Sequence, residues 1–327
     1  MFNLLLKYKL WKYHQYNFGL RVRDPLAEHF QAGDGRMEKR LGAAPPNIRE
    51  NGDWDIDIPP GEPQFKEGFE SWSCVLFSMF DAIETITFAK YGIRENWSDR
   101  SLVNAAEVQK GYGTYFSNGP DAVRKVGLIP ESKWPFDAPY TWEHYTAPLT
   151  WEALLIGERS KNIYRVSNEF IDISNKEKRT ETMKRSPLQV AVQPWFKNAV
   201  GTYYSKPGAA YTHAVLLYKT LTSGKTMILD HYKVNNEYIK TLREDYQFHK
   251  WALAYYVDKM DPMRAIKSKT SPHVYAIMPD GSKSRFLTWG SYTSALAAQA
   301  ITPFVEIDEA ELAKYPDGKA WALIPED

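Results

Sequence analysis

The stretch Phe69-Glu-Ser-Trp-Ser-Cys74-Val-Leu-Phe-Ser78 holds the only cysteine of the 327-residue chain, directly before an apolar run. The run Val75–Tyr91 is apolar nearly all round, which predicts a buried helix, and Gly92 is placed to cap its carboxyl end. A lone cysteine forms no intrachain disulfide. At a helix N-terminus the positive end of the helix dipole favours the thiolate, so Cys74 is a candidate nucleophile.

A histidine and an aspartate further along the chain complete a candidate catalytic group. The segments Thr212–Lys219 and Thr226–His231 predict a β-hairpin. Strand pairing then puts His213 and Asp230 at the same open end of the hairpin. Asp230 is expected to accept a hydrogen bond from one imidazole nitrogen and leave the other facing the thiol. Taken singly, a lone cysteine is usually a small core residue, and a lone histidine usually satisfies a local polar need.

Composition excludes several other classes of function. Lys and Arg number 41 against 40 Asp and Glu, and the net charge of +1 favours neither nucleic acid nor membrane as a partner. No apolar run approaches the roughly 20 residues that span a bilayer. Metal-ligand spacing is missing around the remaining candidate histidines, and no cofactor or metal is predicted. These histidines are His144, His231 and His249.

The start of the chain does not have the pattern of a signal peptide, because three lysines interrupt its apolar residues. The location is therefore left unknown, with the cytoplasm or an assembled particle as the alternatives. The first part, Met1–Arg23, is basic and aromatic. It fits an arm that docks on a partner, a segment that packs on its own domain, or a propeptide that covers a cleft. The lysines are Lys7, Lys9 and Lys12.

The pattern along the chain divides it into three parts and predicts an α+β class, with helices first and strands later. The predicted parts are an N-terminal extension over 1–60, a main domain over 61–260 with a helical insertion at about 141–186, and a small module over 271–327. Helices are expected over Ser98–Val108 and Gly119–Gly127, and a strand over Leu188–Val192.

The C-terminal module has its own pattern. A hairpin is expected between His273–Met278 and Ser284–Leu287, with Asp280-Gly281 at its turn. Asp308 fits a helix N-cap. The module contains no cluster of catalytic residue types, so a binding, attachment or stabilising role is expected for it.

At several places the chain resembles the papain-like cysteine peptidases. Cys74-Val-Leu-Phe-Ser is similar to their Cys-Trp-Ala-Phe-Ser, and Thr212-His-Ala-Val-Leu-Leu217 to Asn-His-Ala-Val-Leu-Val. Ser98-Asp-Arg-Ser-Leu-Val103, the stretch from Asn118 to Phe136, and Pro187-Leu-Gln-Val-Ala-Val192 also resemble family segments. Ile228-Leu-Asp-His-Tyr232 stands where the family has Val-Lys-Asn-Ser-Trp. These matches follow the family's order over roughly Gln64–Val257.

The resemblance implies a two-lobed fold, with a helical lobe, an antiparallel β-barrel-like lobe and a cleft between them. It further implies peptide-bond hydrolysis through a thioester, with Cys74 as nucleophile, His213 as general base and acid, and Asp230 in place of the orienting asparagine. Tyr232 would replace the tryptophan that shields the histidine. A polypeptide or a cell-wall peptide is the implied substrate.

The chain departs from the family at the oxyanion hole and beside the cleft. Gly68 stands where the family has the glutamine of the oxyanion hole, and Gln64 is the nearest upstream candidate to replace it. Trp72 occupies the place of a glycine, and its bulk is expected to reshape the cleft. Gly119 is also assigned to the cleft.

Two hypotheses follow from the resemblance. One is an active cysteine peptidase. The other is a catalytically weak or inactive papain-fold protein with a structural or attachment role. The lack of disulfides resembles papain-like proteins of bacteriophages and small-genome bacteria, which makes a virion component part of the second hypothesis. The 1–23 arm and the 271–327 module would then be assembly contacts.

Overall fold

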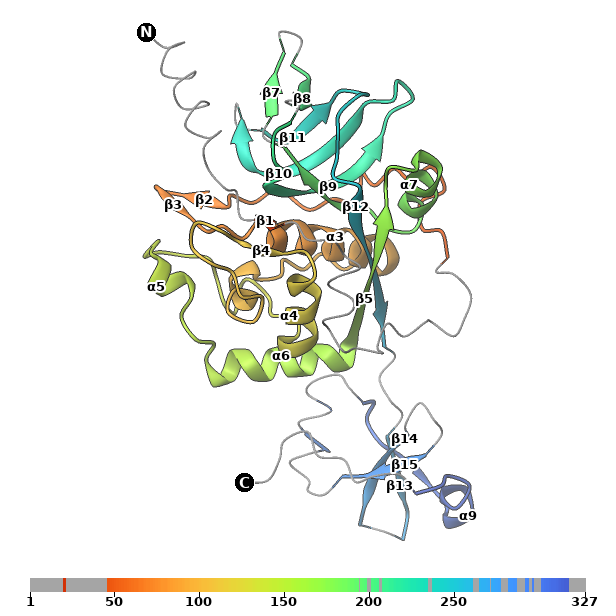
Figure 1. The fold of residues 1–327 in the computed structure, drawn as a ribbon. Helices are drawn as coiled ribbons and strands as arrows, with labels where there is room; N and C mark the ends of the chain where they lie inside the picture. Colours follow the sequence, from red (N-terminus) through yellow and green to blue (C-terminus); the bar gives the residue numbers. More distant parts are fainter. Residues whose placement is uncertain are drawn as a thin grey trace. The chain divides into compact units, whose positions relative to one another are not determined.

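The computed structural model forms two compact units, which are described separately (Figure 1). The first comprises Met1–Leu154 with Val166–Val257, and the second Leu155–Arg165 with Asp258–Asp327. Most of the 1–23 arm and the turn at Asp280-Gly281 lie outside the described residues. The structure describes residues 20–21, 46–193, 195–198, 201–205, 208–234, 237–260, 265–270, 272–277, 282–286, 292–293, 296 and 301–317.

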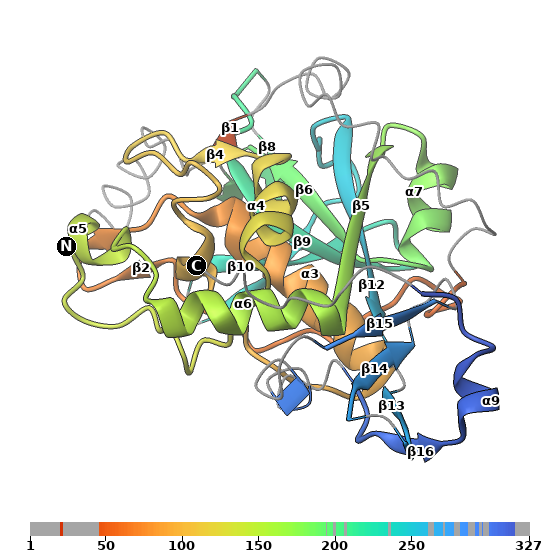
Figure 2. The ribbon, with the colours of Figure 1, turned by 90° about the horizontal axis from the view of Figure 1, so that it is seen from below.

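The central element of the first unit is helix α3, Cys74–Tyr91, as the apolar run predicts. Residues on all sides of its first four turns are buried. The helix ends at Gly92, whose left-handed φ of 67° lets its N–H bond the Phe88 carbonyl. Figures 1 and 2 show α3 between the large sheet and helix α4, Asn118–Val126. Because α3 is buried and begins at Cys74, the thiol lies in the interior of the first unit.

The first unit has a helical lobe, built around α3, and a sheet lobe. The remaining helical elements of the helical lobe are short. The expected helix over Ser98–Val108 is wrong: only a 3₁₀ turn, η1, forms at Asp99–Leu102. Ser98 caps that turn through Ser101 N–H, but Glu107 adopts a left-handed φ of 55°, so a helix cannot continue to Val108. The other elements are β2 (Phe65–Lys66), β3 (Phe69–Glu70), β4 (Thr114–Tyr115) and α5 (Trp142–Tyr145).

The second lobe is a curled, mostly antiparallel sheet. The expected strand over Leu188–Val192 and the expected hairpin are confirmed as β6 and the β9–β10 pair. In spatial order the strands are β5 (Tyr164–Asp172), β12 (Trp251–Lys259), β6 (Leu188–Val192), β9 (His213–Thr220), β10 (Thr226–Val234), β11 (Glu237–Leu242), β8 (Tyr203–Ser205) and β7 (Trp195–Lys197).

The stretch at 141–186 is not wholly helical. It contains α5, α6 (Trp151–Ile163) and α7 (Lys176–Met183), but β5 lies between the last two. The sequence of β5 is rich in β-branched and aromatic residues, which suit a strand that pairs with β12.

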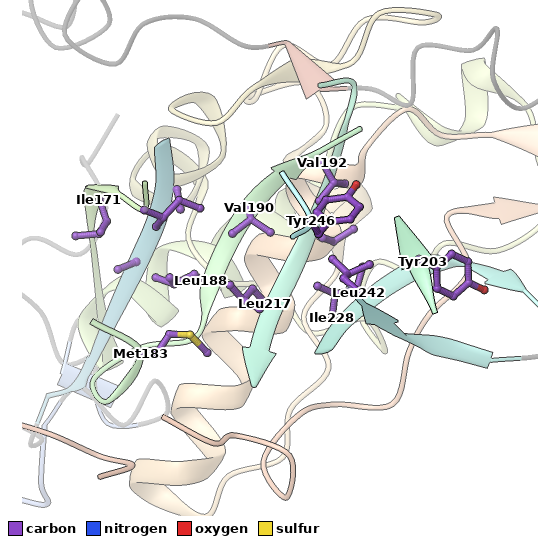
Figure 3. Packing of buried hydrophobic residues seen from close by; sticks show 14 of the residues in the cluster. Ile171, Met183, Leu188, Val190, Val192, Tyr203, Leu217, Ile228, Leu242 and Tyr246 are labelled. Atoms are coloured by element: carbon purple, nitrogen blue, oxygen red, sulfur yellow. The ribbon is translucent and has the colours of Figure 1, made fainter. Parts of the chain in front are cut away.

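The apolar core of the sheet lobe is a cluster of buried side chains packed together on the sheet (Figure 3). Val190, Val215 and Leu217 are fully buried within it. On the side toward α3, a buried glutamine joins the two lobes: Gln189 Nε2 donates to the Val75 carbonyl at 2.7 Å. Tyr255 in turn donates its hydroxyl proton to Gln189 Oε1 at 2.6 Å. A satisfied buried amide of this kind holds the first turn of α3 in a defined position against the sheet.

The second unit contains the predicted C-terminal hairpin. Strands β14 (Val274–Ile277) and β15 (Lys283–Arg285) pair antiparallel, and β14 also pairs with β13 (Ala265–Ser268). Strand β16 (Val305–Ile307) completes this sheet, and helix α9 (Glu309–Leu312) follows. The expected cap is confirmed, because Asp308 Oδ1 accepts the Glu311 N–H at 2.7 Å. Within the described residues, no helix is long and apolar enough to cross a membrane.

Residues ahead of the cysteine also pack on the sheet lobe. Trp54 is completely buried, its backbone N–H donates to the Tyr218 carbonyl at 3.1 Å, and its indole N–H donates to the Met183 carbonyl at 2.7 Å. Ile56, two residues on, is 74% exposed. Trp54 is thus an aromatic anchor that holds this segment to the first unit, in addition to the backbone bonds of Ile48 and Arg49 to the Lys184 carbonyl.

Replacement of this anchor should destabilise the first unit. Trp54→Ala leaves a cavity and an unbonded carbonyl, and we expect the free energy of unfolding to fall by about 3–5 kcal/mol. Urea denaturation followed by circular dichroism measures the change. Ile56→Ala is the matched control and should stay within about 0.5 kcal/mol of the wild type. Equal midpoints for the two variants would contradict the anchoring role.

Candidate active site

Cys74 is the first residue of α3 and is completely buried. Its Sγ accepts a hydrogen bond from the backbone N–H of Ala214 at 3.4 Å. Ala214 lies in β9 directly after His213, so the helix N-terminus and the strand bring the thiol beside the histidine. Cys74 and Ala214 are 140 positions apart in the sequence, and the packing of α3 on β9 joins them.

His213 and Asp230 meet as the hairpin register requires. His213 Nε2 and Asp230 Oδ1 are 2.6 Å apart, and the two side chains are 3% and 0% exposed. The backbone N–H groups of His231 and Tyr232 also donate to Asp230 Oδ1, at 2.7 and 3.3 Å. The Tyr232 ring lies against the imidazole with 5.2 Å between centroids. The carboxylate therefore fixes the ring orientation, and Tyr232 shields one face of the imidazole.

A buried lysine behind Asp230 is a residue that the sequence analysis missed. Lys240 Nζ donates to Asp230 Oδ2 and, at 2.7 Å, to the Tyr232 carbonyl. Lys240 is 1% exposed, whereas Ile239 beside it in β11 is 41% exposed. A lysine on the inward face of a strand with an isoleucine on its outward face is a sequence signal, but only once the strand and its facing direction are known.

Gln64 lies at the site within a network that Glu70 organises. Glu70 Oε1 accepts from Gln64 Nε2 at 2.8 Å and from the Trp72 N–H at 2.9 Å, and Oε2 accepts from the Tyr232 hydroxyl at 2.6 Å. Gln64 Nε2 also donates to the Tyr232 hydroxyl at 2.9 Å. In this closed arrangement the amide donors of Gln64 bind Glu70 and Tyr232. Glu70 was not identified from the sequence, because its role depends on a tight β2–β3 turn.

Trp72 stands in a conformation that suits glycine. Its φ is 51°, in the left-handed region, and its ring packs edge-on against Trp142 with 5.8 Å between centroids. Gly119 serves close helix packing: a Cβ there would come within 3.0 Å of the Met79 sulfur on α3. The Trp72 ring is thus held against Trp142, while Gly119 lets α4 approach α3 closely.

The electrostatics favour an uncharged thiol and imidazole in this closed form. Burial, followed by the nearby charges of Glu70 and Asp230, raises the pKa of Cys74 well above its usual range, which favours the thiol over the thiolate expected from the helix N-terminus. Burial also lowers the pKa of His213, although Asp230 opposes this. Burial opposes ionisation of Asp230 too, but Lys240 and His213 outweigh it and hold the pKa of that carboxyl below its ordinary value.

The part of the N-terminal arm that the structure describes lies next to this site. Leu20 is buried, its N–H donates to the carbonyl of Thr212 at 3.2 Å, and Leu20–Arg21 pairs parallel with Thr114–Tyr115. This contact favours the two interpretations in which the arm lies on its own domain, as a packing segment or as a propeptide. Among the described residues, no group of three or more His, Cys, Asp or Glu side chains could hold a metal ion.

Comparisons with known proteins support the fold. No protein-family model matches the chain, and neither does any curated protein sequence. Among solved structures, xylellain, a cysteine protease from Xylella fastidiosa, matches with a TM-score of 0.50 and 15% identity, over 73% of this chain and 95% of that one. The chain has a papain-like fold. The bromelain protease from Ananas comosus matches with a TM-score of 0.45 and 16% identity, over 62% of this chain and 96% of that one. The fold assignment rests on the xylellain match and on the two lobes described above.

The placement of Glu70 predicts a gain of thiol reactivity on its neutralisation. The charge of Glu70 opposes ionisation of Cys74, so Glu70→Gln should lower the thiol pKa by about one unit and speed alkylation at pH 7 about tenfold. The intact mass after timed exposure to iodoacetamide measures the rate cleanly, because the chain has one cysteine. Glu67→Gln, at the exposed turn of the same hairpin, is the control. Equal rates in the two variants would show that Glu70 does not act on the thiol.

Proposed function

We propose that this protein is a papain-like cysteine peptidase, in which Cys74 attacks a peptide carbonyl and forms a thioester. The observation that carries the proposal is the joint placement of three groups. His213 Nε2 lies 2.6 Å from Asp230 Oδ1, and the N–H of the next residue, Ala214, lies 3.4 Å from Cys74 Sγ. A thiol, a base and an orienting carboxylate in this order are what nucleophilic acyl transfer requires.

The chemistry follows from the two nitrogens of His213. Asp230 engages Nε2, so Nδ1 is the nitrogen that takes the thiol proton as the sulfur–carbon bond forms. The tetrahedral intermediate then loses the amine, which leaves with that proton as the carbon–nitrogen bond breaks. Water attacks the thioester, His213 accepts a proton from it, and the proton returns to the sulfur as the carboxylic acid is released. Each half-reaction therefore uses the same imidazole twice.

The site described above is a resting form that must open for a substrate. Cys74 and His213 are almost inaccessible, and Glu70 accepts hydrogen bonds from the Trp72 N–H and the Tyr232 hydroxyl. The backbone N–H of Cys74, at the first position of α3, is a donor that the helix itself does not use, and it suits an oxyanion. Gln64 would supply the second donor once its amide leaves Glu70. A polypeptide or a cell-wall peptide is the proposed substrate class.

A catalytically weak or inactive papain-fold protein is the second candidate. The complete burial of Cys74 and the binding of the Gln64 amide to Glu70 favour it. In that case the fold would serve a structural or attachment role, with the N-terminal arm and the 271–327 module as contact surfaces. The two candidates differ in whether a thioester forms at Cys74.

Substitution of the proposed nucleophile and base tests the peptidase directly. Cys74→Ser and His213→Ala should each lower the cleavage rate of a fluorogenic casein substrate by roughly 10³-fold or more, because the groups act as one unit. His144→Ala is the control, since His144 is a partly exposed histidine paired with Asp137 on the other lobe. If the wild type cleaves neither casein nor a cell-wall peptide above the Cys74→Ser background, the peptidase proposal fails and the second candidate is favoured.

A further inference from the structure

Lys240 is a long cationic side chain in a place where such residues are rare. It is 1% exposed in β11, and lysine is almost never fully buried unless it is paired. Its alternation with exposed Ile239 shows that the strand turns the lysine inward and the apolar residue outward. In the antiparallel β10–β11 register Lys240 lies opposite Ile228, two residues before Asp230. The fold thus directs this ammonium group to the carboxylate at the candidate active site.

The contacts of Asp230 divide between its two oxygens. Oδ1 faces His213, while Oδ2 accepts a hydrogen bond from Lys240 Nζ. Lys240 has a second acceptor in the carbonyl of Tyr232, the residue whose ring covers the imidazole. A carboxylate buried this deeply needs a compensating charge, because desolvation of an isolated ion costs several kcal/mol. His213 does not supply that charge while it is neutral, so Lys240 must.

We propose that Lys240 is a positioning residue of this site, whose ammonium balances Asp230 so that an ion pair of zero net charge, and not a bare buried carboxylate, holds His213. The inference rests on the proposed function for its catalytic meaning. In physical terms, we infer that the charge of Lys240 controls the proton affinity of His213. A bare carboxylate would hold the ring as imidazolium, which cannot accept a proton from the thiol.

The groups around His213 define what else could alter its titration. His231 is one of them, but it is itself paired with Asp81, with 3.0 Å between Nε2 and Oδ2. Lys240 acts in the direction that the proposal requires, because its charge lowers the pKa of His213 whereas Asp230 raises it. Among the described residues, Asp230 and His231 from β10 and Lys240 from β11 act on the pKa of His213. The Tyr232 ring packs against the imidazole, and Cys74 accepts a hydrogen bond from the N–H of the next residue, Ala214.

The test measures the pKa of His213 by NMR, so it does not depend on activity. In full-length protein with labelled histidines, the resonance of His213 is assigned by its loss in His213→Ala, and the chain has 7 histidines in all. Lys240→Met should raise the pKa of His213 by about one unit or more. Asp230→Asn/Lys240→Met, which replaces the ion pair by two uncharged groups, should return it toward the wild-type value. Lys233→Met, at an exposed position of β10, should leave it unchanged.

Stability provides the second readout. Either single variant, Lys240→Met or Asp230→Asn, leaves one buried charge alone, and we expect its urea midpoint to fall by roughly 1 M or more. The double variant should recover most of that loss. If Lys240→Met does not fold while the double variant does, charge balance is again shown to be the role of Lys240. If both fail to fold, the lysine is needed for packing and the proposal is wrong.

The outcomes separate this proposal from the peptidase proposal. A pKa of His213 that is unchanged in Lys240→Met overturns the role of Lys240, even in an active enzyme. A pKa that rises in the single variant and returns in the double variant supports it. If that pattern is found but the wild type forms no thioester, the charge balance stands and the peptidase proposal fails.

Discussion

A short chain of buried polar groups, from Lys240 through Asp230 to His213, is the constraint on which the site depends. All three side chains are at most 3% exposed, so none can be solvated in place of its partner. Removal of any one leaves a buried charge or a buried imidazole without its support, which is far more costly than the net gain from forming the contacts. The sheet register that brings β9, β10 and β11 together is therefore fixed by polar groups as well as by its apolar core.

The thiol is held against this chain from the other lobe. Gln189 ties the first turn of α3 to β6, and the Ala214 N–H contacts the sulfur directly. Glu70 adds further contacts at the site, because it accepts hydrogen bonds from Gln64 and from the hydroxyl of Tyr232. The result is a neutral, water-poor pair of thiol and imidazole. Burial lowers reactivity at rest, but it also strengthens each interaction with charge that develops during a reaction.

The parts of the site that follow from local sequence could be predicted. The apolar run after Cys74 dictates a buried helix that starts at the thiol, and the hairpin pattern places His213 beside Asp230. Lys240 and Glu70 could not be predicted in this way. Their roles depend on which face of a short strand turns inward and on contacts between residues far apart in the chain. The same limit explains the error at Ser98–Val108, where local helix signals are overridden by a left-handed Glu107.

Acylation of the sole thiol tests the central claim that His213 acts as a base for Cys74. The protein would be mixed with p-nitrophenyl acetate across pH 4 to 8, and intact mass and peptide mapping would locate and count the acetyl groups. The account predicts transfer to Cys74 with an inflection below about pH 6.5, since burial lowers the pKa of His213, and loss of that inflection in His213→Ala. A rate that rises only as a free thiol ionises, with no change in His213→Ala, would contradict the account.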